Sequence, residues 1–436
     1  MNPTVIELPA HELKTALAGL GKVISKRSTL PILGHLRVTR SPTGVVTLQG
    51  TDLDSSVVYQ AEQPDHGEPC DFLAPYAPLH QLVKGSKAPV QLIAEDQQVR
   101  LRTLIGNSPM EQAFEALSVD EFPPTPKATS QPLILDTTFR DTLREALDCC
   151  SDDGTRHVIQ HVCLDTRATD GHYVAATDGR HLYAANSFHF DLKQPVLIPN
   201  RDFLRWNKFM EDGAGQLSVK PATAKTGSWV ELKSGAWTFI TKGCDEPFPN
   251  WKQVVPAADS HLTTVQLNAD AVTTLLAAVP KLPGEDDFNR GVRLEITPTQ
   301  FLLKARRKDA AEWTQLLVDG AQITGKAINI GLNRDFLLKA LRYGLTTLHL
   351  TDDLAPIVFS EGGRRMVVMP LRPDAAPQAA AASQPAQPAA ESSTPNPTTT
   401  NPPEAEPPAQ PQETTMPKES QTSPTEPRSE EHTSEL

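Results

Sequence analysis

The sequence predicts an α+β fold in which one unit, with two helices packed on antiparallel sheets, occurs three times in the chain. Two observations carry this prediction. The pentapeptide Asn-Arg-Asp-Phe-Leu occurs at 200–204 and again at 333–337, so its copies are 133 residues apart. Each third of the first 372 residues also contains a segment typical of a strand, a polar turn and a second strand. Repetition at a near-constant period indicates duplicated domains.

The three copies can be followed element by element. The first helix of each copy is predicted at residues 10–24, 137–150 and 268–282. The strand–turn–strand segments follow at 34–54, 160–180 and 290–309, with apolar residues at alternate positions. The second helix is predicted at 71–85, 200–209 and 333–341. In the last two copies an Asn is a good N-cap, and the Asp two residues later suits the positive end of the helix dipole.

Proline-rich joints at 121–132 and 246–256 are typical of linkers and divide the repeats. We therefore expect domains at 1–122, 131–250 and 261–372, with six helices in the chain.

Residues 373–436 differ in composition from the rest. This segment holds 14 of the 39 prolines and no aromatic residue, and it contributes −8 of the net charge of −12. Low hydrophobicity with many prolines and acids predicts a disordered tail. The last nine residues, 428–436, resemble a translated sequencing adapter, so no functional inference is drawn from them.

The composition and the N-terminus indicate an intracellular protein. The five cysteines show no metal-like CxxC spacing, which predicts reduced thiols. No signal-peptide core is found, and no run approaches 18 apolar residues. A cytoplasmic location is expected.

The sequence offers no catalytic motif. P-loop, GxSxG, HExxH and GxGxxG patterns are all missing. His157 and His161 are four residues apart, but no carboxylate-rich metal spacing accompanies them, and Asp152 with Asp153 is typical of a loop. We therefore expect no enzymatic activity, no metal and no cofactor.

Six motifs, taken together and in order, resemble one protein family. They are RSTLPILGHLRV (27–38), TDLDSS (51–56), AATDGRHLYAA (175–185), PFPNWKQVVP (247–256), NRGVRLEI (289–296) and VVMPLR (367–372). The chain resembles the bacterial DNA polymerase III beta subunit, the sliding clamp, over residues 1–372. The resemblance implies three clamp domains per chain and a head-to-tail homodimer that forms a ring around duplex DNA. It further implies a role in replication as a processivity factor.

The resemblance also implies how the ring closes. An edge strand near residues 99–106 of one chain is expected to pair with one near 299–306 of the other. Leu275 and Leu276 are either apolar support for this contact or ordinary core residues.

A sliding protein needs phosphate contacts, which are blind to base sequence. Basic side chains on the predicted helices and their loops are candidates, with a solvated surface role as the alternative for each. Arg27 and Arg201 match basic positions that approach DNA in the family. Arg334 and Lys339 also lie on the last predicted helix. The predicted DNA-binding residues are Lys22, Lys26, Arg27, Lys84, Arg201, Arg205 and Arg342.

The resemblance places a peptide-binding pocket between the second and third domains. It would receive QLxLF-like motifs of the polymerase catalytic subunit, the clamp loader and repair factors. Without the resemblance, 176–180 would be only a hairpin turn and 367–372 only a last strand. The predicted pocket residues are Ile159, Thr177, Gly179, Arg180, His181, Leu182, Pro249, Val254, Phe336, Val367, Met369, Pro370, Leu371 and Arg372.

Two other functions stay open from the sequence. One is a clamp-like paralogue, of phage or plasmid origin, that binds partners without the main replicative role. The other is a DNA-processing enzyme that carries basic helices, which metal-dependent turnover would reveal.

Overall fold

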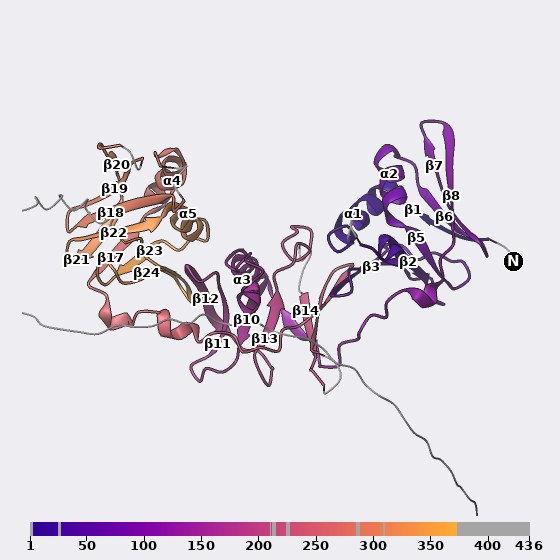
Figure 1. Cartoon of the computed structure of the whole chain (residues 1–436), viewed down its shortest axis with the longest axis horizontal. Coiled ribbons are helices and arrows are strands. Elements are labelled where there is room, and N and C mark those ends of the chain that lie inside the picture. Colours follow the sequence, from indigo (N-terminus) through magenta and orange to yellow (C-terminus); the bar gives the residue numbers. More distant parts are fainter. Residues whose placement is uncertain are drawn as a thin grey trace, which may run out of the picture. The chain divides into compact units, whose positions relative to one another are not determined.

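A computed structural model describes residues 3–24, 28–209, 211, 215–223, 227–284, 288–307 and 310–372. The predicted tail, 373–436, lies outside the described residues, and so do two predicted DNA contacts, Lys26 and Arg27. Figure 1 shows the helices and strands of the chain.

The elements recur in a similar order in the three repeats, and short 3-10 turns connect several of them. The first repeat contains β1 (Thr4–Leu8), α1 (Ala10–Leu20), β2 (His35–Arg40), β3 (Val46–Thr51), β4 (Ser55–Gln60), β5 (Cys70–Pro75), α2 (Tyr76–Gly85), β6 (Val90–Ala94), β7 (Gln98–Ile105) and β8 (Ser108–Glu115). The second contains β9 (Leu133–Leu135), α3 (Thr137–Asp148), β10 (His161–Asp165), β11 (His172–Thr177), β12 (His181–Phe188), β13 (Val196–Pro199), β14 (Gly215–Lys220), β15 (Trp229–Ser234) and β16 (Trp237–Lys242). The third contains β17 (Thr263–Leu267), α4 (Ala269–Ala278), β18 (Gly291–Thr297), β19 (Gln300–Ala305), β20 (Thr314–Leu317), β21 (Ala321–Gly325), β22 (Ile328–Asn333), α5 (Arg334–Arg342), β23 (Thr347–Leu350), β24 (Ile357–Glu361) and β25 (Arg364–Val368).

Two large antiparallel sheets run across the predicted domain boundaries. In the first, the strand order is β5-β2-β3-β4-β16-β15-β14-β9, so β4 of the first repeat pairs with β16 of the second. In the second, the order is β13-β10-β11-β12-β25-β24-β23-β17-β21, so β12 pairs with β25. Each joint therefore pairs equivalent strands of neighbouring repeats through backbone hydrogen bonds. The exact domain limits at 122, 131, 250 and 261 stay predictions, because the described residues belong to one contiguous unit.

Two four-stranded sheets remain, with the orders β1-β6-β7-β8 and β20-β19-β18-β22. By their place in the repeat, β8 is equivalent to β16 and β25, and β20 is equivalent to β4 and β12. The expectation that 99–106 and 299–306 are edge strands is wrong. Each of these segments is followed by one more strand, β8 or β20, which pairs with it and takes the edge position.

The fold class is confirmed, with one local difference. The predicted helix at 200–209 forms consecutive turns instead of an α-helix. Its N–H groups bond mostly three residues back, as from Leu204 to Arg201 and from Phe209 to Trp206. The side chain of Arg144 on α3 donates to the carbonyls of Asn207 and Phe209. A short segment whose carbonyls have side-chain donors loses little by not continuing as a helix.

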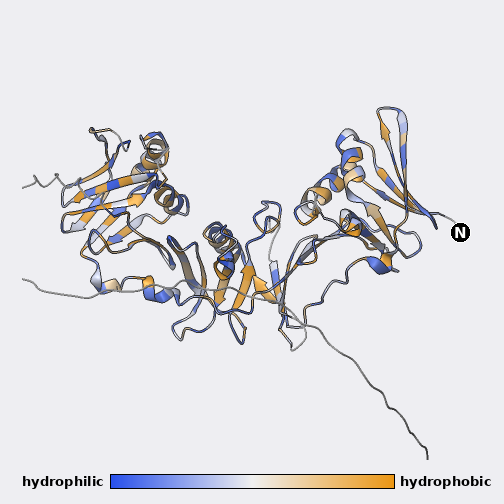
Figure 2. Cartoon of the chain, in the orientation of Figure 1, coloured by the Kyte–Doolittle hydropathy of each residue, from blue (hydrophilic) through white to orange (hydrophobic). Residues whose placement is uncertain are grey.

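The core lies between the helices and the sheets. Figure 2 shows apolar and polar residues interleaved along the strands, as expected for sheets with one face against helices. Leu275 is completely buried in the core of the third repeat, and Leu276 packs against it half-buried. Leu275 is therefore a core residue. The five cysteines are all free thiols, as the sequence predicts.

Candidate functional site

The predicted pocket is built around the hairpin that joins β11 to β12. The Thr177 hydroxyl donates to the His181 carbonyl and accepts the Gly179 N–H, which closes the turn. Gly179 has a φ of +86°, and a Cβ there would lie 2.6 Å from an Arg156 guanidinium nitrogen. That nitrogen donates to the Asp178 carbonyl at 3.0 Å. Glycine is therefore required at 179 both by its conformation and by the neighbouring side chain.

The C-terminal strand extends the pairing along this hairpin. β25 pairs with β12 in the register Leu182 to Val367. Beyond it, the Met369 N–H donates to the Arg180 carbonyl at 3.0 Å, and the Leu371 N–H donates to the Gly331 carbonyl at 2.8 Å. Residues 369–371 thus connect the second and third repeats.

One face of this junction is apolar. Leu182 and Val367 are buried in one cluster, and Ile159 packs against it from the outside. Because side chains alternate along a strand, Met369 lies on the same face as Val367, and its side chain is 37% exposed. Val254 is 40% exposed. The other predicted pocket residues are half-buried (Thr177, Pro370, Leu371) or exposed (Gly179, Arg180, Pro249, Arg372).

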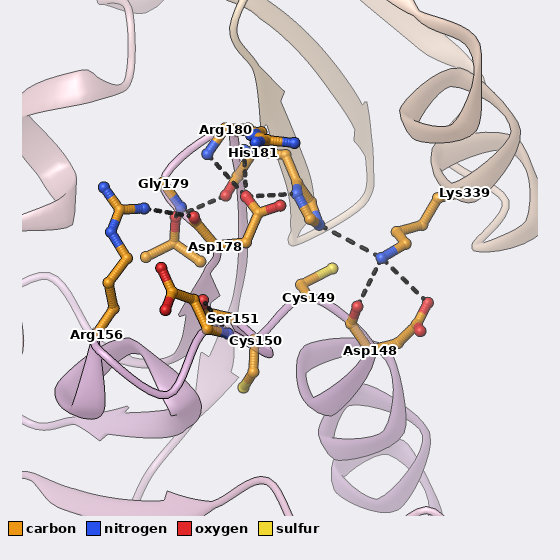
Figure 3. A network of polar contacts seen from close by, with 12 residues as sticks. Asp148, Cys149, Cys150, Ser151, Arg156, Asp178, Gly179, Arg180, His181 and Lys339 are labelled. Carbon is orange, nitrogen blue, oxygen red and sulfur yellow. Dashed lines mark hydrogen bonds and ion pairs between the residues drawn. The ribbon is translucent and has the colours of Figure 1, made fainter. Parts of the chain in front are cut away.

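The opposite face is polar and aromatic. His181 pairs with Val368 and is buried, and its ring stacks on Phe336 of α5 with a centroid distance of 4.4 Å. Lys339, one turn further along α5, donates to the Asp148 carbonyl at 2.6 Å and lies 3.5 Å from Nε2 of His181 (Figure 3). The structure therefore separates the predicted pocket residues: His181 and Phe336 form a joint between repeats, while Leu182 and Val367 belong to the apolar face.

Charged groups reinforce this joint. Burial raises the pKa of Asp178, but the contact with His181 and two backbone N–H bonds outweigh it, so that the pKa is lowered. Burial raises the pKa of Glu145, which pairs with Arg364 of β25 at 2.8 Å and accepts a hydrogen bond from Tyr183. A carboxylate held by two partners fixes the relative register of α3, β12 and β25.

Tyr343, Asp148 and Phe288 also contribute to this region and are not among the residues predicted from the sequence. Tyr343 donates to the Asp148 carboxylate at 2.6 Å, and Lys339 bonds the same residue. Phe288 is 83% exposed, with the Arg180 guanidinium 5.5 Å from its ring centroid. An exposed phenylalanine is a signal that burial reveals and sequence periodicity does not.

The apolar face continues to Pro249 and Val254 through a buried anchor. The Trp251 indole N–H donates to the Asp165 carboxylate at 3.0 Å, and Arg167 binds the same carboxylate. Burial raises the pKa of Asp165, but these hydrogen bonds outweigh it and hold the pKa at about 2. Asp165 thus keeps the 249–254 segment against β10.

The predicted DNA contacts differ in their surroundings. Lys22, Lys84 and Arg342 are exposed, in the turn after α1, near the end of α2 and at the end of α5. Arg205 is exposed but bonds Asn200 and pairs with Asp152 at 3.3 Å. Arg201 is half-buried and lines a cavity of about 320 Å³ with His157 and His161.

Arg334, equivalent to Arg201 in the repeated pentapeptide, has a different surrounding. It is completely buried and donates to the carbonyls of Leu282, Pro283 and Arg290. Together with the engaged Lys339, this leaves Arg342 as the exposed base of the last predicted helix.

Among the described residues, we find no helix with the length and apolar character needed to cross a membrane.

No profile of a known protein family and no curated protein sequence matches this chain. Solved structures do match. The sliding clamp of Bartonella birtlesii bound to griselimycin superposes with a TM-score of 0.72 at 19% identity, covering 85% of this chain and 100% of that one. The beta subunit of Streptococcus pyogenes DNA polymerase superposes with a TM-score of 0.73 at 16% identity, covering 85% of this chain and 100% of that one. The beta subunit of Pseudomonas aeruginosa DNA polymerase III superposes with a TM-score of 0.70 at 20% identity, again covering 85% of this chain and 100% of that one. This chain has the fold of the bacterial DNA polymerase III beta-subunit sliding clamps.

Proposed function

We propose that this chain is a DNA sliding clamp, which encircles duplex DNA and tethers a polymerase and other factors to it. The observation that carries the proposal is the fold. Within the chain, the repeats are joined by two strand pairs, β4 with β16 and β12 with β25, and the corresponding strands β8 and β20 lie at sheet edges. In this role the protein supplies no catalytic group and acts in the cytoplasm.

The leftover edges support a head-to-tail homodimer. β8 has the same position in its repeat as β16 and β25, and β20 has the same position as β4 and β12. A β8–β20 pair between two chains would therefore have the same arrangement as the β16–β4 and β25–β12 pairs within one chain. Large apolar side chains are exposed near both edges, namely Leu104, Ile105, Met110 and Leu317. A contact between two different surfaces that closes after two copies gives a ring.

The mass of the protein in solution tests this contact. We expect a dimer of about twice the chain mass of 47.5 kDa in light scattering. Leu317→Glu on β20 is expected to shift the mass toward the monomer, since it buries a charge at the contact. Leu354→Glu, at another exposed leucine, in the β23–β24 loop, serves as the control. Equal masses for the two variants would contradict the β8–β20 contact.

DNA binding without base recognition rests on the exposed bases Lys22, Lys84 and Arg342. Removing one phosphate contact is expected to reduce the slope of log affinity against log salt by about one. Lys84→Ala and Arg342→Ala, measured on short linear duplexes of two unrelated sequences, should weaken binding to both equally. Weaker binding to only one of the two sequences would contradict phosphate contacts.

The partner site rests on the apolar face, where Ile159 and Met369 are accessible and the buried Leu182 and Val367 support them. Such a surface suits a leucine or phenylalanine anchor, and methionine adapts to partners of different shape. A QLxLF-type peptide is therefore expected to bind, and the double variant Met369→Ala, Leu371→Ala is expected to bind it at least tenfold more weakly. Leu354→Ala is the control. Unchanged binding in the double variant would contradict this placement of the site.

A primer-extension assay with the polymerase of the same cell separates the main replicative clamp from a clamp-like paralogue. A replicative clamp lengthens the products made in one binding event, whereas a paralogue that only binds partners leaves them unchanged.

A further inference from the structure

Three side chains with metal-ligating atoms come together around the start of β10. His157 lies in the 3-10 turn before β10, His161 is the first residue of β10, and Cys244 follows β16. Their ligand atoms all lie within 4.8 Å of one another. Cys244 is 83 residues further along the chain than His161, so the fold creates this cluster and sequence spacing does not reveal it.

The distances suit a tetrahedral ion. Nδ1 of His157 lies 3.8 Å from Sγ of Cys244. In a tetrahedral zinc site, with Zn–N near 2.05 Å and Zn–S near 2.3 Å, a nitrogen and a sulfur ligand are about 3.6 Å apart. Small rotations of the two side chains would therefore bring both atoms within bonding distance of one ion.

His161 is already oriented as a ligand. Its Nδ1 lies 3.0 Å from the His157 carbonyl, and because a carbonyl can only accept, Nδ1 carries the proton. With the proton on Nδ1, Nε2 of the neutral ring has a free lone pair. Histidine ligands of metals commonly donate their other ring N–H to a backbone carbonyl in this way.

A fourth coordination position is available on the solvent side. His157 and His161 line the cavity of about 320 Å³ that also contains Ser151, Asp152 and Asn200. This volume accommodates a water ligand. Asp54 and Asp152 at the same cavity offset the positive charges of Arg201 and Lys242.

We propose that His157, His161 and Cys244 bind one zinc ion, with water as the fourth ligand. Two imidazoles and one thiolate select Zn²⁺ over Mg²⁺ or Ca²⁺, which prefer oxygen ligands. The thiolate forms by loss of its proton on binding. The ion would connect the start of β10 to the segment that leads from β16 to Phe248 and Trp251, two members of the buried cluster against which Ile159 packs. The ion would thus fix the position of the segment that packs beneath the apolar face.

Titration of the full chain with Zn²⁺ tests the proposal. The protein carries no histidine tag, is kept reduced, and is freed of metal with a chelator. We expect one Zn²⁺ per chain and a rise in the thermal midpoint on its addition. With Co²⁺ as the probe, we expect a thiolate-to-metal absorption band in the near ultraviolet.

Matched variants identify the ligands. His157→Ala and Cys244→Ser are expected to weaken Zn²⁺ binding more than tenfold, and Cys244→Ser is expected to lose the Co²⁺ band. His157 is exposed and Cys244 half-buried, so both variants should fold, which their metal-free thermal midpoints check. His189→Ala and Cys70→Ser change residues of the same types elsewhere and should bind Zn²⁺ as the wild type does. Either no stoichiometric binding at micromolar Zn²⁺, or equal binding in ligand and control variants, would overturn the proposal.

Discussion

The repeated pentapeptide gives a sharp test of whether equivalent residues have equivalent duties. Arg334 and Arg201 occupy the same position in the two copies. Arg334 is completely buried, whereas Arg201 is half-buried at a cavity, and its Nε has no hydrogen-bond partner among the described atoms. We therefore predict that Arg334→Met lowers the free energy of unfolding and that Arg201→Met leaves it nearly unchanged.

The magnitude follows from the contacts of the guanidinium. Arg334 donates to the Leu282 carbonyl at 2.6 Å, to the Pro283 carbonyl, and to the Arg290 carbonyl at 3.1 Å. The Arg290 carbonyl keeps a donor in the variant, because the backbone N–H of residue 334 also bonds it. The other two carbonyls lose the guanidinium, at about 1–3 kcal/mol each where the group is buried. Methionine fills most of the volume and adds no large cavity, so the two carbonyls together give an expected decrease in the free energy of unfolding of about 2–6 kcal/mol.

Urea unfolding followed by tryptophan fluorescence measures this decrease, since Trp313 lies in the same repeat as Arg334. Arg334→Met should lower the urea midpoint, while Arg201→Met should stay within about 1 kcal/mol of the wild type, as surface substitutions do. In DNA binding we expect the opposite order of the two variants. At low salt, Arg201→Met should bind short duplex DNA more weakly than Arg334→Met and the wild type do. Equal stability of Arg334→Met and the wild type would refute the structural role of Arg334.

Two further predictions concern the hairpin and the support of the apolar face. Gly179→Ala places a Cβ against Arg156 in a left-handed backbone. It should lower the free energy of unfolding more than Gly106→Ala does, where φ is +63° but the space is open. The left-handed conformation alone costs about 1–2 kcal/mol. Thermal midpoints of the two variants measure the difference, and equal midpoints would show that the Arg156 contact is unimportant. Asp165 has a pKa lowered to about 2, so its contribution to stability is complete above its unfolded pKa of about 3.9 and disappears as the pH falls through about 2. Urea midpoints between pH 5 and pH 2 should fall less steeply for Asp165→Asn than for the wild type, and parallel curves would contradict this assignment.

The sequence predicts the threefold repeat because duplicated elements keep their local signals. Asn268 and Asn333 cap α4 and α5, and Asn333 begins one of the two repeated pentapeptides. The other copy begins at Asn200 with the same cap signal, yet the segment that follows forms turns. Packing of Phe203 against Phe209 and Phe239, and the Arg144 side chain on the segment's carbonyls, override the local preference.

The position of a strand within a sheet is harder to predict from the sequence than the strand itself. Residues 98–105 and 300–305 do form strands, but whether a strand lies at an edge depends on whether the next hairpin adds another. β8 has exposed residues on both faces and β20 is only four residues long, so neither shows a strong alternating pattern.

The candidate sites show the same limit. Apolar residues such as Leu182 and Val367 follow from strand alternation, whereas the stacking of His181 on Phe336 depends on the contact between two repeats. The exposure of Phe288 and the meeting of Cys244 with two histidines likewise arise only when distant segments pack together.

The closed ring is tested most directly by retention on DNA of different topology. The protein is loaded onto nicked circular DNA by its clamp loader, the salt is raised to about 1 M, and bound protein is separated by gel filtration. At this salt the Debye length falls to about 3 Å, so phosphate contacts no longer hold the protein. A topological ring predicts that protein stays with the circular DNA and dissociates when the same DNA is cut once. Dissociation from the intact circle at the same rate as from the linear form would contradict the ring.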